Sequence, residues 1–296
     1  MRGPWIIAIS MAGLLSAGAD APDDPLLRPV APDHARQWLT PQEPVRLFGS
    51  TYLVGFGGLN VALIRTSDGL ILIDGAVPQA VHDIEANIAR LGYSIRDVRL
   101  ILSTEPHYDH AGGIAALARD SGATTVAGAA AAPVLRDGGG DPDDPQAAWL
   151  ARFPGVTNVR AARDGERIRL GDTVITAHAT PGHTLGSMSW SWTQCEGRSC
   201  KRIVFASSLN PIAADGWHFG DPTHRRFVQA FRGTFAKVQA MGCDMLITSH
   251  PASGDGDKLA RLALAREPHP FARADACRAY ADDARIALDK RLAQGL

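Results

Sequence analysis

The sequence predicts an α/β sandwich in which two β-sheets lie between outer layers of helices. Strand-like and helix-like segments occur in two successive sets along the chain, an order that fits such a sandwich better than a doubly wound sheet. No linker divides the two sets, so we expect one domain over residues 20–296.

Length and charge favour a large globule and argue against two classes of partner. The chain has 296 residues, of which 45% are hydrophobic, enough for one large core or at most two smaller ones. The 30 basic and 31 acidic residues nearly cancel, and the pI is about 6.8. This balance gives no electrostatic reason to expect binding to nucleic acid or to an anionic membrane.

The first set of elements begins with antiparallel strands. In residues 51–76, apolar runs alternate with Gly and Asp turns, which predicts successive strands with a hairpin turn at residues 67–69. Residues 77–93 have apolar positions at helical spacing, and this predicted helix stops at Gly92. Residues 98–104 are a short β-rich run whose composition indicates burial on both faces.

The rest of the chain continues this order. A helix is predicted at residues 113–122, a strand at 124–129 and a loop rich in Gly, Pro and Asp at 136–146. The later pattern predicts three strand-like segments, at residues 166–180, 187–193 and 201–208. An amphipathic helix at 225–241, a strand at 243–250 and a closing helix at 274–294 follow.

The N-terminus has the pattern of a secretory signal peptide at residues 1–19. A short basic start precedes an apolar run at residues 6–16 and a small-residue cleavage site, Ala-Gly-Ala, at residues 17–19. The apolar run is too short for a membrane span, so a lone N-terminal anchor is the weaker alternative. We therefore expect a mature chain that starts near Asp20, works in a bacterial periplasm and has no membrane association after cleavage.

An oxidising compartment favours disulfides among the four cysteines. Four cysteines allow three pairings. Cys195 and Cys200 flank a tight polar turn between two strand-like segments, so a bond across that turn is geometrically easy and leaves Cys243 to pair with Cys277. A zinc-ligand role is the weaker alternative, because no CxxC pair is present and oxidation removes the thiolates.

One loop carries four potential metal ligands. A buried strand leads into it, and within six residues it offers Glu105, His107, Asp109 and His110. Zinc is held by neutral imidazoles, thiolates or carboxylates in a roughly tetrahedral array. Because alternate side chains of an extended segment point to one side, Glu105 and His107 are predicted to bind one ion together. Asp109 and His110 then turn towards a neighbouring ion as the next helix begins.

Each ion still needs a third protein ligand, and two later histidines are candidates. His183 follows a Thr-Pro-Gly turn and His250 closes a predicted strand, so both lie at strand ends, where a loop-borne site needs them. A lone histidine is more often an ordinary surface or core residue. We assign that role to the remaining histidines, His34, His82, His178, His218, His224 and His269.

Three segments resemble the metal-binding motifs of the metallo-β-lactamase superfamily: STEPHYDHAGG, TPGHTLGS and ITSHP. The runs WLTPQEP, DPDDPQ and ASSLNP, with the spacing of Cys243 and Cys277, narrow the resemblance to the class B, subclass 3 enzymes from about His34 to Arg291. Another subclass has a cysteine ligand at about the position of Ser207 and Ser208, and the glyoxalase II-like and lactonase-like branches place a bridging aspartate there. The two serines therefore favour subclass 3 and argue against those branches.

The resemblance implies a four-layer αβ/βα sandwich with two Zn²⁺ in a cleft at one edge of the sheets. The implied ligands of the first zinc are Glu105, His107 and His183. Those of the second are Asp109, His110 and His250.

Glu105 departs from the resemblance, because most of the subclass has histidine there; Pro106 and Tyr108 also replace small residues. Glutamate is a competent zinc ligand, so loss of the site is not expected. Two Zn²⁺, a bridging hydroxide and the Asp109 carboxylate leave a net charge of +2, which the Glu105 carboxylate lowers to +1. We expect a weaker Lewis acid at the first site and an active hydrolase that is less efficient or narrower.

The implied reaction is the opening of a β-lactam ring, an antibiotic-resistance activity, by a zinc-bound hydroxide that Asp109 helps to orient. Ser208 and Asn210 are implied contacts of the substrate carboxylate, with ordinary strand-end polarity as an equal alternative. Trp38, Phe153 and the loop at residues 141–146 either line the cleft or pack in the core or on the surface.

Two other functions remain open. One is a lactonase or another ester- or phosphodiester-cleaving enzyme on the same fold, although no basic cluster or bridging aspartate favours it. The other is a weakly catalytic or non-catalytic zinc-binding protein whose first site is impaired. The only partner that we expect is a small-molecule β-lactam substrate, and we expect a monomer.

Overall fold

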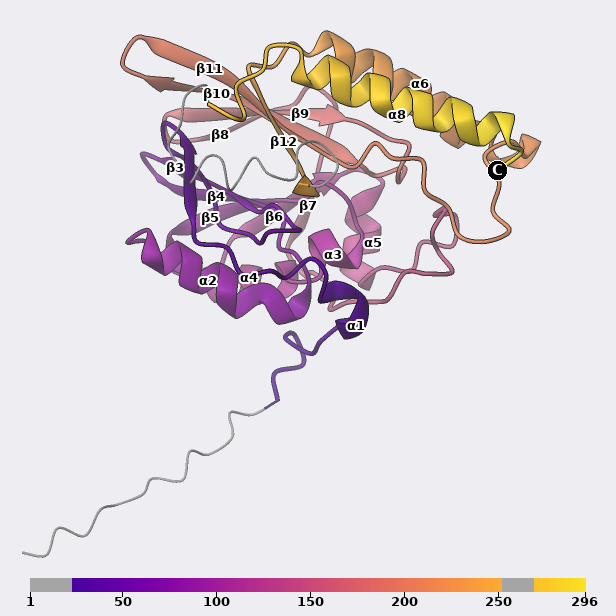
Figure 1. The fold of residues 1–296 in the computed structure, drawn as a ribbon. Coiled ribbons are helices and arrows are strands. Elements are labelled where there is room, and N and C mark those ends of the chain that lie inside the picture. The colour runs from indigo at the N-terminus through magenta and orange to yellow at the C-terminus, as the bar shows by residue number, and fades with distance from the viewer. Residues whose placement is uncertain (1–22, 252–268) are drawn as a thin grey trace, which may run out of the picture.

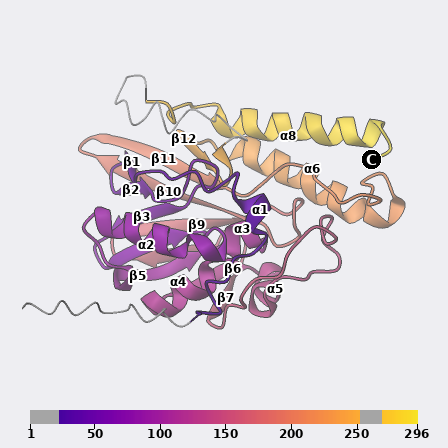
Figure 2. The same cartoon turned by 60° about the horizontal axis from the view of Figure 1, so that its bottom comes forward.

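The computed structural model describes residues 23–251 and 269–296. Figure 1 shows two β-sheets packed face to face between two layers of helices. Helices α2 and α4 cover one sheet, and α6 and α8 lie side by side over the other, as the turned view in Figure 2 also shows. The predicted four-layer αβ/βα sandwich is thus confirmed, whereas the predicted signal peptide at residues 1–19 lies outside the described residues.

The elements have the following bounds. The α-helices are α1 Pro32–Ala35, α2 Val81–Arg90, α3 Tyr108–Ala111, α4 Ile114–Ser121, α5 Ala131–Asp137, α6 Arg225–Ala240 and α8 Ala276–Ala293. The 3-10 helices are η1 Pro78–Ala80, η2 Ile95–Asp97 and η3 Pro222–His224. The strands are β1 Val45–Phe48, β2 Thr51–Leu53, β3 Ala62–Thr66, β4 Gly69–Ile73, β5 Val98–Leu102, β6 Thr124–Gly128, β7 Val159–Ala162, β8 Arg167–Leu170, β9 Thr173–Ala179, β10 Met188–Glu196, β11 Ser199–Ala206 and β12 Met245–Thr248. Among the described residues, no helix is both long and apolar enough to cross a membrane.

Each sheet mixes antiparallel and parallel pairing. The first sheet has the order β1-β2-β3-β4-β5-β6-β7, antiparallel as far as β4 and parallel beyond it. The second has the order β12-β11-β10-β9-β8, in which only β11 and β12 run parallel. Loops that leave β5, β9, β11 and β12 meet at one edge of the sandwich, where the polar motifs of the sequence gather.

Both faces of strand β4 are buried, which explains why its sequence is a continuous apolar run and not an alternating one. Leu70 and Leu72 pack towards the helical layer that contains α2 and α4, whereas Ile71 and Ile73 pack between the two sheets. Full burial of one such side chain contributes roughly 1.5–3 kcal/mol. A third core lies between the second sheet and helices α6 and α8, with Phe231 at its centre.

Several short elements were not expected from the sequence, among them strands β1 and β7 and helix α5. Strands β1 and β7 are four-residue edge strands of the first sheet, and such short segments owe their order to the strand beside them. Helix α5 occupies part of a small-residue segment and runs two residues into the predicted loop at 136–146. It ends at Gly138, which adopts φ +77°, a left-handed conformation that favours glycine.

Both disulfides expected from the sequence are present. Cys195 and Cys200 face each other across the β10–β11 hairpin, with Cα atoms 4.0 Å apart. Cys243 and Cys277 join the segment before β12 to the first turn of α8, with Cα atoms 6.0 Å apart. The second bond therefore ties the closing helix to the strand that leads to His250.

Candidate metal centre

The metal-ligand loop is held by close backbone packing. After β5 the chain passes through residues 103–107 and enters the short helix α3. The backbone N–H of Gly75 donates to the carbonyl of His110 over 2.8 Å. A Cβ atom on Gly113 would lie 2.3 Å from the carbonyl oxygen of Gly75, so only glycine allows this approach. The pair of glycines that ends the loop motif thus fixes the loop against the end of β4.

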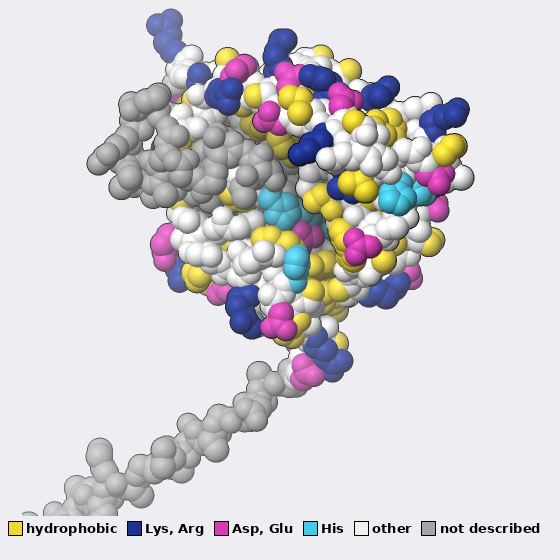
Figure 3. All heavy atoms as spheres, turned by 45° about the vertical axis from the view of Figure 1, so that its right-hand side comes forward, with side chains coloured by type: hydrophobic (Ala, Val, Ile, Leu, Met, Phe, Trp, Pro, Cys, Tyr) yellow, Lys and Arg dark blue, Asp and Glu magenta, His cyan; other side chains and the backbone are white. Residues whose placement is uncertain are grey.

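Three predicted ligands of the second site lie together. Ligand atoms of Asp109, His110 and His250 all lie within 4.8 Å of one another. The Asp109 Oδ2 atom is 3.2 Å from Nε2 of His110 and 3.2 Å from Nε2 of His250. His250, at the end of β12, remains partly exposed, whereas the other two side chains are buried. Figure 3 shows imidazole and acidic side chains gathered in a hollow on this face of the molecule.

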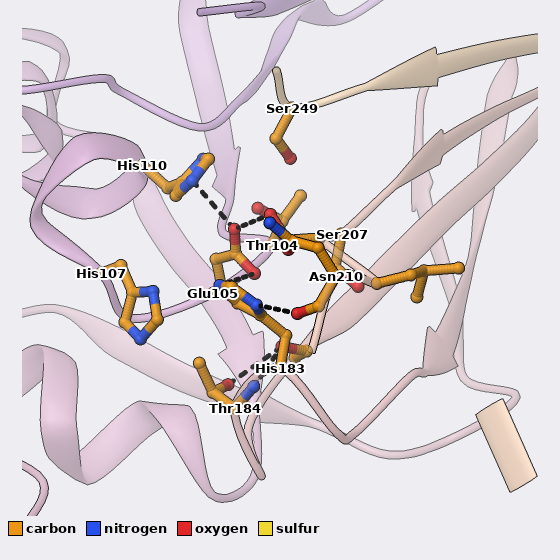
Figure 4. Close-up of polar contacts among 12 residues, drawn as sticks. Thr104, Glu105, His107, His110, His183, Thr184, Ser207, Asn210 and Ser249 are labelled. Atoms are coloured by element: carbon orange, nitrogen blue, oxygen red, sulfur yellow. Dashed lines mark hydrogen bonds and ion pairs between the residues drawn. The ribbon is translucent and has the colours of Figure 1, made fainter. Parts of the chain in front are cut away.

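Glu105 is fully buried and lies between His110 and His183 (Figure 4). Its Oε1 atom accepts a hydrogen bond of 2.6 Å from the Ser208 hydroxyl and lies 2.9 Å from Nε2 of His110. Its Oε2 atom has no hydrogen-bond partner among the described residues and lies 4.0 Å from Nε2 of His183. A buried carboxylate oxygen without a partner is costly unless a ligand completes it. This oxygen and the His183 nitrogen therefore face a position that suits a metal ion.

His107 and His183 each use one ring nitrogen for orientation. Nε2 of His107 lies 2.9 Å from Oδ2 of the buried Asp144, which leaves Nδ1 as the nitrogen for a ligand. Nδ1 of His183 lies 2.9 Å from the carbonyl oxygen of Asn210, which leaves Nε2. Nε2 of His183 also lies 3.2 Å from the Gln146 amide. Metal-bound histidines commonly bind a carboxylate or carbonyl through their second nitrogen, and both rings have this arrangement.

Asp74 provides a third orienting contact. It follows β4 with φ +65°, and its carboxylate accepts hydrogen bonds of 2.7 Å from both the backbone N–H and the hydroxyl of Thr104. Its Oδ2 atom is 3.6 Å from Nδ1 of His110, so it faces the nitrogen that is not directed at Asp109. A predicted ligand of the second site thus faces a buried acid, as His107, a predicted ligand of the first site, also does.

Electrostatics keep the carboxylates ionised. Burial alone would raise the pKa of Glu105, but His110 and His183 hold it well below its ordinary range. Burial opposes ionisation of Asp109 as well, yet His110 keeps the pKa of this carboxyl well below its ordinary value. Burial lowers the pKa of His183, which favours the neutral imidazole that a metal needs. Each predicted set combines one carboxylate with two imidazoles, a donor set that suits zinc, so the residues present fit the metal.

Proton competition at His110 gives a pH dependence. Burial alone would lower the pKa of His110, but the charges of Asp109 and Glu105 raise it well above its ordinary value. Metal binding must displace this proton, so metal affinity should rise with pH below the raised pKa, by about tenfold per pH unit for each proton displaced. Competition of zinc with a calibrated chelator at pH 6, 7 and 8 measures this slope. An affinity that stays constant over this range would contradict it.

Asp144 allows a second test of the geometry. Replacement Asp144→Asn keeps the shape of the side chain but removes the charge that binds Nε2 of His107. We expect zinc affinity at the first site to fall roughly 10–100-fold, as is usual when the orienting partner of a metal ligand is lost. The control is Asp143→Asn in the same loop, where an exposed ion pair with Arg226 contributes little. Equal affinities of the two variants, measured by chelator competition, would rule out the role of Asp144.

The remaining sequence candidates lie as follows. Ser208 points its hydroxyl at Glu105, and Oδ1 of Asn210 is buried without a partner among the described residues. The Trp38 ring lies 5.5 Å from the His250 ring, at the margin of the centre. Phe153 is buried in the first core, so packing explains it. The histidines assigned to ordinary roles do not join the cluster and contact residues outside it, for example Ser191 for His178 and Trp217 for His224.

Sequence reasoning missed Asp74 altogether, and it named the loop at residues 141–146 as a possible wall of the cleft without assigning a contact to Asp144 or Gln146. Asp74 ends an apolar strand, a position where a lone acid is a recognisable signal. Asp144 and Gln146 lie in DPDDPQ, whose position in the sequence gives no sign of which side chain turns inward.

Comparisons with known proteins show the family to which the chain belongs. Residues 54–195 match the family model described as the metallo-β-lactamase superfamily. The chain is 51% identical to a subclass B3 metallo-β-lactamase with an active-site glutamic acid, with a TM-score of 0.85 over 92% of this chain and 98% of that one. It is 40% identical to Rm3 metallo-β-lactamase, with a TM-score of 0.85 over 90% and 99% of the two chains. BJP-1, a subclass B3 enzyme of Bradyrhizobium japonicum, is 38% identical, with a TM-score of 0.79 over 88% and 98%.

Curated relatives are more distant. A hydroxyacylglutathione hydrolase of Anaeromyxobacter dehalogenans is 29% identical over 74% of this chain, and one of Rhodospirillum rubrum is 25% identical over 50%. The matches span only 66% and 48% of those two proteins, whereas the match to the enzyme with the glutamic acid spans nearly all of it. The chain belongs to the subclass B3 metallo-β-lactamases.

Proposed function

We propose that this protein is a zinc-dependent β-lactam hydrolase with two Zn²⁺ per chain. The observation that carries the proposal is Glu105, whose buried Oε2 atom lacks a partner among the described residues and faces Nε2 of His183. A chain that is 51% identical and is itself a B3 enzyme with an active-site glutamic acid supports this interpretation.

The proposed ligands form two sets. Glu105, His107 and His183 bind the first ion, and Asp109, His110 and His250 bind the second. Divalent metal held here supplies Lewis acidity towards a carbonyl oxygen and lowers the pKa of bound water to about 7. The donor chemistry, with imidazole and carboxylate and no thiolate, is suited to zinc.

Side chains of the protein are proposed to orient the attacking water and to bind the substrate. Asp109 is the proposed catalytic residue, because its carboxylate stays ionised at neutral pH and would orient the attacking water by accepting a hydrogen bond from it. The side-chain NH2 group of Asn210 is a proposed donor to the substrate carboxylate. Ser208 is the second proposed contact, although its hydroxyl is already engaged by Glu105. Trp38 supplies an apolar wall beside His250.

The setting of the enzyme is part of the proposal. A signal peptide at residues 1–19 directs a single-domain monomer of residues 20–296 to the periplasm, and the two disulfides support an oxidising compartment. β-Lactam antibiotics are the proposed substrates, so the enzyme confers resistance to them.

The decisive assay uses purified zinc-loaded protein with a penicillin, a cephalosporin, a carbapenem and a lactone. We expect hydrolysis of at least one β-lactam and its loss in chelator, restored by added zinc. Lactone cleavage without β-lactam hydrolysis would instead favour an esterase. Tight metal binding without any hydrolysis would favour a binding protein.

Replacement Glu105→His tests the effect of charge. It raises the net charge of the proposed loaded centre by one unit, which should strengthen the Lewis acid and the attraction of an anionic substrate. We expect a severalfold increase in turnover or in zinc affinity, measured by steady-state kinetics and by chelator competition on the same preparation. No gain in either quantity would remove the charge argument.

A further inference from the structure

Tyr280 lies on helix α8, an element that supplies none of the proposed metal ligands. Its hydroxyl donates a hydrogen bond of 3.2 Å to the carbonyl of Ser207 and accepts one of 3.2 Å from the backbone N–H of Leu209. A single phenol therefore bridges the residues on either side of Ser208. The ring itself packs against the core between the second sheet and the outer helices.

The bridged segment, residues 207–210, contacts two proposed ligands of the first metal. The Ser208 hydroxyl occupies Oε1 of Glu105, and the Asn210 carbonyl occupies Nδ1 of His183. These bonds leave Oε2 of the glutamate and Nε2 of the histidine facing each other across 4.0 Å. This segment thus fixes which atom of each ligand is turned towards the other, although Nε2 of His183 also has the Gln146 amide 3.2 Å away.

Tyr280 is itself well fixed. The Cys243–Cys277 disulfide anchors α8 to the segment before β12, and the backbone N–H of Cys277 donates to the Cys243 sulfur over 3.1 Å. Tyr280 follows Cys277 by about one helical turn. Burial raises the pKa of its phenol, and the nearby charge of Glu105 adds to the increase, so the hydroxyl keeps the proton that it donates.

We propose that Tyr280 is a positioning residue for the first metal site, acting through residues 207–210 on Glu105 and His183. The inference rests on the proposed two-metal function. Within residues 23–251 and 269–296, no hydrogen bond joins this segment to Asp109 or His250. Loss of the phenol hydroxyl should therefore weaken one metal equivalent and spare the other.

The test compares wild type, Tyr280→Phe and the control Tyr93→Phe, which removes a phenol hydroxyl from a ring that packs beside Tyr52 and the first core. Zinc affinity is measured by chelator competition, and the Co²⁺-substituted proteins are compared by their absorption spectra. We expect Tyr280→Phe to weaken one equivalent roughly tenfold or more, the scale for loss of a group that orients a metal ligand. Its second equivalent and both equivalents of the control should match wild type.

Four outcomes would overturn the inference or its basis. Two unchanged equivalents in Tyr280→Phe would overturn the role of Tyr280 alone, and so would equal weakening of both. A wild type that binds fewer than two equivalents would instead contradict the proposed function. If Tyr280→Phe yields no folded protein, Ser208→Ala carries the same expectation, and wild-type affinity of both equivalents in that variant overturns the link through this segment.

Discussion

Asp109→Asn should reduce kcat/KM for a β-lactam by more than about 100-fold, because it removes a ligand and not only the partner of a ligand, whose loss costs roughly 10–100-fold. The Asp109 Oδ2 atom lies 3.2 Å from a ring nitrogen of each of the two histidines of its set, so both histidines lose the group that they share. We expect one zinc equivalent to be lost with the activity. Steady-state kinetics and metal analysis measure the two effects.

The matched control for Asp109→Asn is Asp83→Asn, which changes the same charge on the exposed face of α2. Circular dichroism establishes that both variants are folded. If Asp109→Asn retains two zinc equivalents and more than about a tenth of wild-type activity, Asp109 is not a ligand of the kind proposed.

Asp74→Ala should destabilise the protein most among the substitutions considered, by about 2–4 kcal/mol. The two donors of Thr104 lose their acceptor in a buried position, and an unsatisfied buried donor costs roughly 1–3 kcal/mol. Alanine at φ +65° adds backbone strain of about 1–2 kcal/mol. Relief from burying a carboxylate, whose pKa is raised by burial, offsets part of this sum.

The control for this prediction is Asp74→Asn, because asparagine tolerates a positive φ and still offers one acceptor to Thr104. Urea unfolding of the three proteins in the presence of a chelator should give free energies in the order wild type, Asn, Ala. Equal stabilities of the Ala and Asn variants would show that neither the backbone conformation nor the bonds to Thr104 stabilise the loop.

The metal-ligand loop and the strand-end histidines could be predicted because their chemistry is local. Glu105 and the residues after it follow an apolar strand directly, and His183 and His250 each close or follow another. The four-layer order could be predicted for a similar reason, since helix and strand periods differ within short windows. Both disulfides could be predicted because Cys195 and Cys200 face each other across a hairpin, which leaves Cys243 and Cys277 as the other pair.

What could not be predicted depends on contacts between distant segments. Asp144 lies among three aspartates of one loop, and only the fold turns this one towards His107. Tyr280 lies on a helix whose pattern indicates ordinary core packing. Its proposed role depends on its hydrogen bonds with the carbonyl of Ser207 and the backbone N–H of Leu209, which only the fold brings near. Strand β7 is specified by its parallel neighbour β6 rather than by its own four residues.

A crystal structure of the protein grown with excess zinc, with anomalous data collected at the zinc edge, tests the central claim most directly. We expect two anomalous peaks, one of them about 2.0–2.2 Å from a carboxylate oxygen of Glu105 and bound also by His107 and His183. A single peak at Asp109, His110 and His250, with Glu105 still bonded only to Ser208 and His110, would contradict the account.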